Sequence, residues 1–187
     1  MDISALHRQA LDATRPLVAG TSGEHLDLPT PDDDWDVRAL LNHVVAGNWW
    51  AAELVAGKTI EDVGDRLDGD VLGPDPLDAY DASAEAAAKA FEMPGALAAP
   101  CAVSYGPVPG EVYAGHRFLD VLLHGWDLAQ ATGQSTALDP GLVQAALDVL
   151  TPQWDALRGS GAFKTDVPVP EDGDPQTRLL AMVGRRG

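Results

Sequence analysis

The sequence predicts an all-α protein: a bundle of about four main helices with long loops and an extra helix near the C-terminus. Apolar residues recur at the three- and four-residue spacing of amphipathic helices in several long segments. Clusters of glycine, proline and aspartate separate these segments, and none shows the alternation of a half-buried strand. With 187 residues the chain can bury a substantial core, so we expect one domain over residues 1–187.

Composition argues against several classes of partner and location. The formal net charge of −17 predicts no nucleic-acid partner and no anionic-membrane partner, since both require positive patches. No run approaches the roughly 18 apolar residues of a membrane span. The first residues lack the basic region and apolar stretch of a signal peptide. Cys101 is the single cysteine and fits a reducing compartment, so we expect a cytoplasmic protein.

A first helix is predicted for residues 3–19, and the turn at residues 20–23 ends it. Neither His7 in this helix nor His25 beyond it has a suitable metal-ligating residue three or four positions away. We therefore interpret both histidines as surface residues.

A second helix is predicted for residues 37–56. Asp36 is its expected N-cap, and Trp35 before the cap is expected to pack on the first turn as a hydrophobic staple. His43 shares a face of this helix with small and apolar residues, namely Ala39, Leu40, Ala46, Gly47 and Trp50. Small residues let a neighbouring helix approach closely, so we expect His43 to point inward.

Residues 58–76 form the longest irregular segment and predict a surface loop, which at this length is either mobile or functional. A third helix is predicted for residues 77–92. Residues 96–110 are extended and punctuated by prolines, and they lead into a fourth helix over about residues 111–132. Gly133 is expected to end it in the left-handed conformation.

Asp139 and Pro140 predict the start of a fifth helix, an N-cap followed by proline at the first helical position. Pro152 should kink or interrupt it. A glycine-rich stretch follows from residue 159, and residues 176–182 predict a last short helix.

The fourth helix carries the residues on which the functional hypothesis depends. His116, Asp120 and His124 recur every four residues and so share one helix face, surrounded by apolar side chains. An acid four residues before a histidine can ligate one metal ion from a single helix. With His43 as the best candidate for a third ligand, the sequence predicts a metal site formed by His43, Asp120 and His124. Two imidazoles and one carboxylate suit open catalytic zinc; ferrous iron and nickel are alternatives.

Each residue also has an ordinary structural interpretation. His43 alone would more often be a hydrogen-bonded core histidine. Asp120 could pair with Arg117 or cap a helix, although an unpaired acid among apolar neighbours is costly. His116 could replace His43, orient Asp120 through a hydrogen bond, or lie at the surface, and we leave it out of the ligand set.

Three neighbours of this helix face have proposed roles of their own. Asp127 is expected to hold the free ring nitrogen of His124 or to pair with a base at the surface. Tyr113 is a candidate proton donor near the site. Cys101 is interpreted as a small buried residue, because no basic residue stands beside it in the sequence.

Two segments resemble the signatures of the mycothiol-dependent maleylpyruvate isomerase metal-binding domain, which belongs to the DinB-like superfamily of four-helix metal-binding proteins. They are residues 35–43, WDVRALLNH, and residues 120–133, DVLLHGWDLAQATG. The C-terminal segment 178–186 resembles an actinobacterial subgroup known mainly as uncharacterised metal-binding proteins. The resemblance extends over nearly the whole chain.

The resemblance implies a divalent metal, usually zinc, held here by His43, Asp120 and His124. In the isomerase the acid of the pair is Glu, whereas this chain has Asp120. The isomerase also has a further C-terminal domain, and we expect the residues after the fifth helix to be too few for it. The family further suggests a low-molecular-weight thiol, mycothiol, as co-substrate.

These features lead to a first hypothesis of a metal-dependent thiol transferase or isomerase that acts on a small electrophilic molecule. Residues 58–76 and 99–110 would shape its substrate pocket. A second hypothesis is a non-catalytic metal- or ligand-binding protein, and a third is hydrolysis by a metal-bound water. The assembly state is left open, with a homodimer as one alternative.

Overall fold

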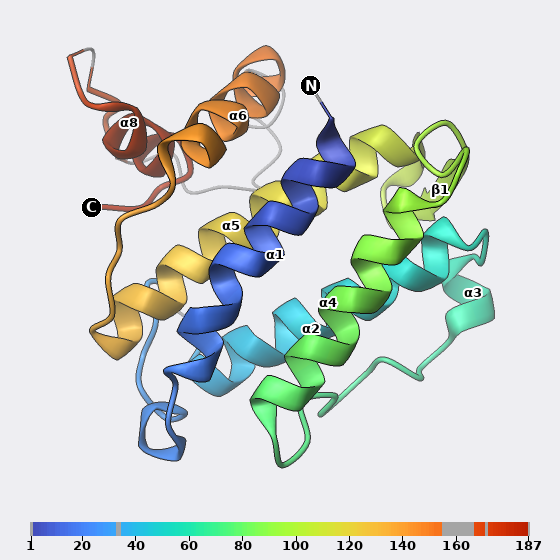
Figure 1. Ribbon diagram of the computed structural model, residues 1–187, viewed down its shortest axis with the longest axis horizontal. Helices are drawn as coiled ribbons and strands as arrows, with labels where there is room; N and C mark the ends of the chain where they lie inside the picture. The colour runs from blue at the N-terminus through green and yellow to red at the C-terminus, as the bar shows by residue number, and fades with distance from the viewer. Residues whose placement is uncertain (1, 33–34, 155–166, 171, 187) are drawn as a thin grey trace. The chain divides into compact units, whose positions relative to one another are not determined.

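Helices make up most of the residues that the structure describes, which are 2–32, 35–154, 167–170 and 172–186 (Figure 1). This computed structural model confirms the predicted all-α, DinB-like class. The chain divides into two units, Met1–Ser135 and Thr136–Gly187. That both units belong to a single domain over residues 1–187 stays a prediction.

Four long helices build the first unit, and their bounds match the predicted segments within one residue. They are α1 (Ile3–Ala19), α2 (Val37–Val55), α4 (Pro76–Glu92) and α5 (Gly110–Thr132). Helices α1 and α2 each pack against both α4 and α5, so the four surround one core (Figure 1). No helix in the described ranges combines the length and the apolar surface that crossing a bilayer requires.

Local signals at the helix ends act as the sequence predicts. The Asp36 carboxylate accepts the Ala39 N–H at 2.7 Å and so caps the first turn of α2. Gly133 ends α5 with φ 68°, a left-handed conformation that glycine adopts without a steric penalty. These ends fix which residues of α2 and α5 belong to each helix, and hence which side chains face the core.

The segment 58–76 is more ordered than expected. It contains a short helix, α3 (Ile60–Val63), and is then tied to α2 by one side chain. The Asn42 amide donates to the Gly69 carbonyl at 2.9 Å, while its oxygen accepts the N–H groups of Val71 and Leu72. Because Asn42 directly precedes His43, this loop is anchored beside the predicted site.

The segment 96–110 contains a hairpin that the sequence analysis missed. Strands β1 (Pro100–Val103) and β2 (Gly106–Pro109) pair antiparallel, with Cys101 opposite Val108. Each strand has four residues, and prolines occupy positions where alternation would otherwise show, so no strand pattern was visible. Cys101 is fully buried in an apolar cluster, which confirms its interpretation as a buried residue.

The second unit contains α6 (Pro140–Leu150), the 3₁₀ turn η2 (Thr151–Gln153) and α8 (Pro175–Met182). Asp139 and Asp174 cap α6 and α8, each followed by proline at the first helical position. Pro152 ends the regular helix, as predicted. Helix α6 packs against α8. The glycine-rich stretch 159–166 lies outside the described residues.

His7 corrects a prediction. Its place in the sequence predicts a surface residue, but its side chain is 0% exposed and its ring meets Phe91 edge-on at 5.1 Å between centroids. Neither ring nitrogen has a hydrogen-bond partner among the described residues. Burial, with the guanidinium groups of Arg117 and Arg8, lowers the pKa of His7 to about 3. The error arose because a lone histidine has no helical partner whether it faces water or an aromatic core.

Replacing His7 by leucine should make folding less sensitive to acid. Below its ordinary pKa of 6.5, His7 takes up a proton in the unfolded chain but not in the folded protein, until the pH reaches about 3. Stability is therefore lost as pH falls through this window, by about 1.4 kcal/mol per pH unit. Urea unfolding between pH 6 and pH 4 should show this slope reduced in His7→Leu.

Leu11→Ala provides the control, since Leu11 is another buried residue of α1 but carries no titrating group. It should lower the unfolding free energy without changing its pH slope. Parallel slopes for the wild type and His7→Leu would contradict the prediction.

Candidate metal centre

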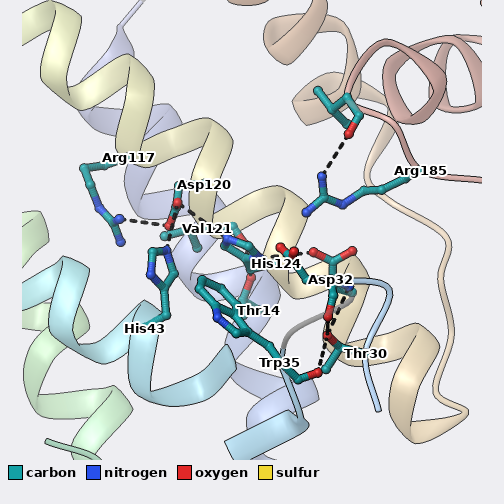
Figure 2. A network of polar contacts seen from close by, with 12 residues as sticks. Thr14, Thr30, Asp32, Trp35, His43, Arg117, Asp120, Val121, His124 and Arg185 are labelled. Atoms are coloured by element: carbon teal, nitrogen blue, oxygen red, sulfur yellow. Dashed lines mark hydrogen bonds and ion pairs between the residues drawn. The ribbon is translucent and has the colours of Figure 1, made fainter. Parts of the chain in front are cut away.

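Helices α2 and α5 bring His43, Asp120 and His124 together, although His43 and Asp120 are 77 residues apart in the chain (Figure 2). Oδ1 of Asp120 lies 3.2 Å from Nε2 of His43 and 3.6 Å from Nε2 of His124. All three ligand-type atoms lie within 4.8 Å of one another. The His43 ring therefore faces Asp120 and His124 on α5, in the inward direction that the sequence predicts.

These spacings suit a small divalent cation. Four ligands about 2.0–2.1 Å from zinc in a tetrahedron are separated from each other by about 3.3 Å. The two nitrogen–oxygen distances of 3.2 and 3.6 Å bracket this value. The donor set of two imidazoles and one carboxylate is one that zinc and ferrous iron both accept. The residues present therefore fit a divalent metal ion with further positions open.

Asp120 remains charged because Arg117 meets it directly. Burial alone would raise the pKa of this carboxyl, but Arg117 together with His124 and His43 holds the pKa well below its usual range. Nη1 of Arg117 donates to Oδ2 of Asp120 at 2.8 Å. The pairing of Asp120 with Arg117, offered as an alternative to a ligand role, thus occurs alongside the ligand geometry, because each uses a different oxygen.

His124 lies between two carboxylates, one at each ring nitrogen. Its Nδ1 is 3.1 Å from Oδ2 of Asp127, whose side chain is fully buried, while Nε2 faces Asp120. Burial would lower the pKa of His124, but Asp120 and Asp127 raise it to about 9. With Nδ1–H donating to Asp127, Nε2 is the nitrogen directed at the centre. Of the two roles predicted for Asp127, the geometry favours holding the free ring nitrogen.

Trp35 forms one wall of the centre, a role that the sequence analysis did not foresee. Its ring lies 4.6 Å from that of His43 and 5.5 Å from that of His124, between centroids. Thr30 positions this segment, because its N–H and hydroxyl both donate to the Trp35 carbonyl (Figure 2). These bonds fix the backbone at Trp35, from which the indole packs beside the two histidines.

The centre opens towards solvent on the side of α2. The side chain of His43 is 36% exposed, that of Asp120 is 25% exposed and that of His124 is 10% exposed. A small molecule can therefore approach from the side of His43, while His124 is held from within the bundle.

His116 and Tyr113, which lie earlier on α5, are not part of this group of three residues. His116 lies within hydrogen-bonding distance of the Tyr105 hydroxyl, 2.5 Å from its Nδ1, rather than within the group of three ligands. Tyr113, a predicted proton donor, is buried in the apolar cluster against Phe91, and burial raises its pKa to about 12. The prediction for Tyr113 is therefore not supported by its position.

Asp32 and Asn48 are polar neighbours of the centre that sequence reasoning missed. Asp32, His124 and Asp127 form a second group whose ligand-type atoms lie within 4.8 Å of one another. Asn48 is fully buried and contacts Arg117. The available signal for Asn48 was its place as an amide side chain within the apolar stretch 44–52 of α2. Asp32 gave no such signal, because it stands in an acidic turn.

The fold and the arrangement of side chains define a DinB-like helical bundle with a possible metal-binding geometry between two of its helices. Residues 7–129 match the family model of the mycothiol maleylpyruvate isomerase N-terminal domain, and the chain belongs to this family. All three candidate ligands lie within the matched residues. The resemblance of the two helical motifs is thereby confirmed.

Two relatives come from Mycobacterium tuberculosis, from strains CDC 1551 / Oshkosh and ATCC 25618 / H37Rv. Each is an uncharacterized protein that is 38% identical to this chain over 194 residues. The alignment covers 99% of this chain and 98% of each relative. No solved structure matches the chain significantly. The mycobacterial relatives agree with the predicted actinobacterial subgroup.

Proposed function

We propose that this protein binds one divalent metal ion, Zn²⁺ in preference to Ni²⁺ or Fe²⁺, through His43, Asp120 and His124. The observation that carries the proposal is the convergence of their ligand atoms on one point at spacings of 3.2 and 3.6 Å. Buried Asp127 supports it, because a carboxylate on the outer nitrogen of a histidine orients the ring and strengthens the inner nitrogen as a ligand.

We further propose that the protein is a thiol S-transferase or thiol-dependent isomerase acting on a small electrophilic molecule. The family match supports a low-molecular-weight thiol such as mycothiol as co-substrate. A divalent cation would supply one piece of chemistry, since it lowers the pKa of a bound thiol and so favours the nucleophilic thiolate.

The chain's own residues have distinct roles in this proposal. His43, as the most exposed of the three, borders the side from which thiol and electrophile would approach. The Trp35 ring packs beside both histidines and would shield that side of the centre from water. Asp127 holds His124 from within the bundle. The assembly state stays a separate expectation, with a homodimer as one alternative.

His43→Ala and His124→Ala should each lose stoichiometric metal. Each substitution removes one of three protein ligands. The loss of metal affinity should therefore exceed the factor of about 10–100 that is typical when a residue bonded to a ligand is replaced. Elemental analysis of purified protein, followed by Zn²⁺ titration of the metal-free form, measures both quantities. His25→Ala is the matched control, because His25 lies in η1 (Gly23–His25) and accepts the Ser22 N–H. Full metal content in both site variants would refute the ligand assignment.

Asp127→Asn should weaken Zn²⁺ binding by about 10–100-fold while leaving the three ligands in place. The amide keeps the size of the side chain but loses the charge that strengthens His124 as a ligand. Competition with a chromogenic chelator measures the affinity. Asp148→Asn in α6 serves as a comparison, since it removes one acidic charge from an exposed side chain that bonds to Gln144. Equal affinities for Asp127→Asn and the wild type would contradict this role.

Metal removal should separate a catalytic role from a structural one. Most buried side chains between the four helices are apolar and do not touch the three ligands, so the metal-free protein should keep its helical circular dichroism. It should lose conjugation of mycothiol to a chromogenic aryl halide and regain it with Zn²⁺. Unfolding on metal removal would favour a structural metal. Retained folding without any thiol-dependent reaction or thermal shift would favour a non-catalytic binding protein.

A further inference from the structure

Arg117 divides the Asp120 carboxylate into two oxygens with different partners. Its Nη1 donates to Oδ2 at 2.8 Å, whereas Oδ1 is the atom 3.2 Å from His43 and 3.6 Å from His124 (Figure 2). A carboxylate that is free to turn can offer one or both oxygens to a cation. Here the guanidinium engages one oxygen and leaves the other directed at the histidines.

The guanidinium is held directly by α2 and, through a residue of α2, indirectly by α4. Arg117 is 7% exposed, and its Nη2 donates to Oδ1 of Asn48 in α2 at 3.2 Å. The Asn48 amide donates in turn to the Ser83 hydroxyl in α4 at 3.3 Å, and that hydroxyl donates to the Tyr80 carbonyl at 3.0 Å. The chain of hydrogen bonds therefore connects α4, α2 and α5, and it ends on Asp120.

Gly47 provides the space that the guanidinium occupies. A Cβ atom at this position would lie 2.4 Å from Nη1 and 2.6 Å from Cζ of Arg117. Glycine inside a helix is less stable than alanine, so the helix by itself does not explain a glycine at position 47. The close approach of the Arg117 guanidinium to the α2 backbone explains why this position is glycine.

We propose that Arg117 is a positioning residue that binds Oδ2 of Asp120 and so presents only Oδ1 to a metal ion. The inference rests on the proposed metal site. It adds that Arg117 determines which oxygen of Asp120 binds the metal ion. Asp120 is then a monodentate ligand, and the geometry of the centre depends on Asn48 and Gly47, neither of which is in the ligand set. A structure with this arrangement favours low coordination numbers, as in zinc sites.

The direction in which metal affinity changes when Arg117 is replaced distinguishes a positioning role from simple charge repulsion. A guanidinium near a cation site repels the cation, so removal of its charge alone would strengthen metal binding. Loss of a positioning partner should instead weaken it, by about 10–100-fold as for other outer partners of metal ligands. Arg117→Met removes the charge and hydrogen bonds but keeps an unbranched apolar side chain in the core.

The experiment compares Zn²⁺ affinity and the visible absorption of the Co²⁺ form in the full chain and its variants. Arg117→Met should bind Zn²⁺ about 10–100-fold more weakly. Its Co²⁺ spectrum should lose the intensity of a four-coordinate ion as Asp120 offers both oxygens. Gly47→Ala keeps every charge but displaces the guanidinium, so it should change both readouts in the same direction. Gly23→Ala is its control, because a Cβ there meets nothing within 4 Å.

A double-mutant cycle completes the test. Because both substitutions act through the same contact, Gly47→Ala combined with Arg117→Met should bind Zn²⁺ no more weakly than Arg117→Met alone. Unchanged or tighter Zn²⁺ binding with an unchanged Co²⁺ spectrum in either single variant would overturn the role of Arg117 and leave the metal site intact. Absence of Zn²⁺ and Co²⁺ binding by the wild type would overturn the metal site itself, and the role of Arg117 with it. Should Arg117→Met fail to fold, Gly47→Ala still decides the question, since only a flexible side-chain end has to move.

Discussion

The carboxylate of Asp120 is the constraint on which the rest of the centre depends. A charged acid on a helix that is otherwise buried must be met by partners, because leaving it unpaired in an apolar setting is costly. Arg117 meets one oxygen, and His43 and His124 lie near the other. Arg117 and His124 lie on α5 with Asp120, whereas His43 comes from α2, so the full set of partners is complete only when these helices are packed. The chemistry of the site and the packing of the bundle are therefore one problem.

The bundle solves this problem with a polar network that crosses its core. Asn48 and Ser83 are fully buried, yet each has a hydrogen-bond partner, as buried polar groups require. His7 is the contrasting case, since it is buried against Phe91 without a hydrogen bond to the described residues and stays neutral because burial lowers its pKa. Asn48 and Ser83 thus support the centre through hydrogen bonds, whereas His7 is tolerated in the core because it is uncharged.

Membership of the mycothiol maleylpyruvate isomerase N-terminal domain family gives this arrangement a functional setting. The matched residues 7–129 contain the candidate ligands, Arg117 and the network that holds it. Within this setting the acid is aspartate, whose short side chain reaches from the α5 backbone to one point between two histidines. A short acid with one oxygen already engaged by Arg117 would have little freedom in how it ligates the proposed metal ion.

The sequence by itself determined the helices, their caps and the pairing of Asp120 with His124 on one helix face, because these depend on residues a few positions apart. It also named His43 as the third candidate ligand, but the packing of α2 on α5 decided that His43 meets Asp120, 77 residues away. Asp36 caps α2 and Asp120 precedes His124 by one turn whatever the tertiary fold. Only the tertiary structure decided what meets across the bundle. The burial of His7, the orientation of Trp35 and the contact of Asn48 with Arg117, which are 69 residues apart, depend on how helices pack. The hairpin at 100–109 likewise became visible only when its two short strands paired, since no local period marks them.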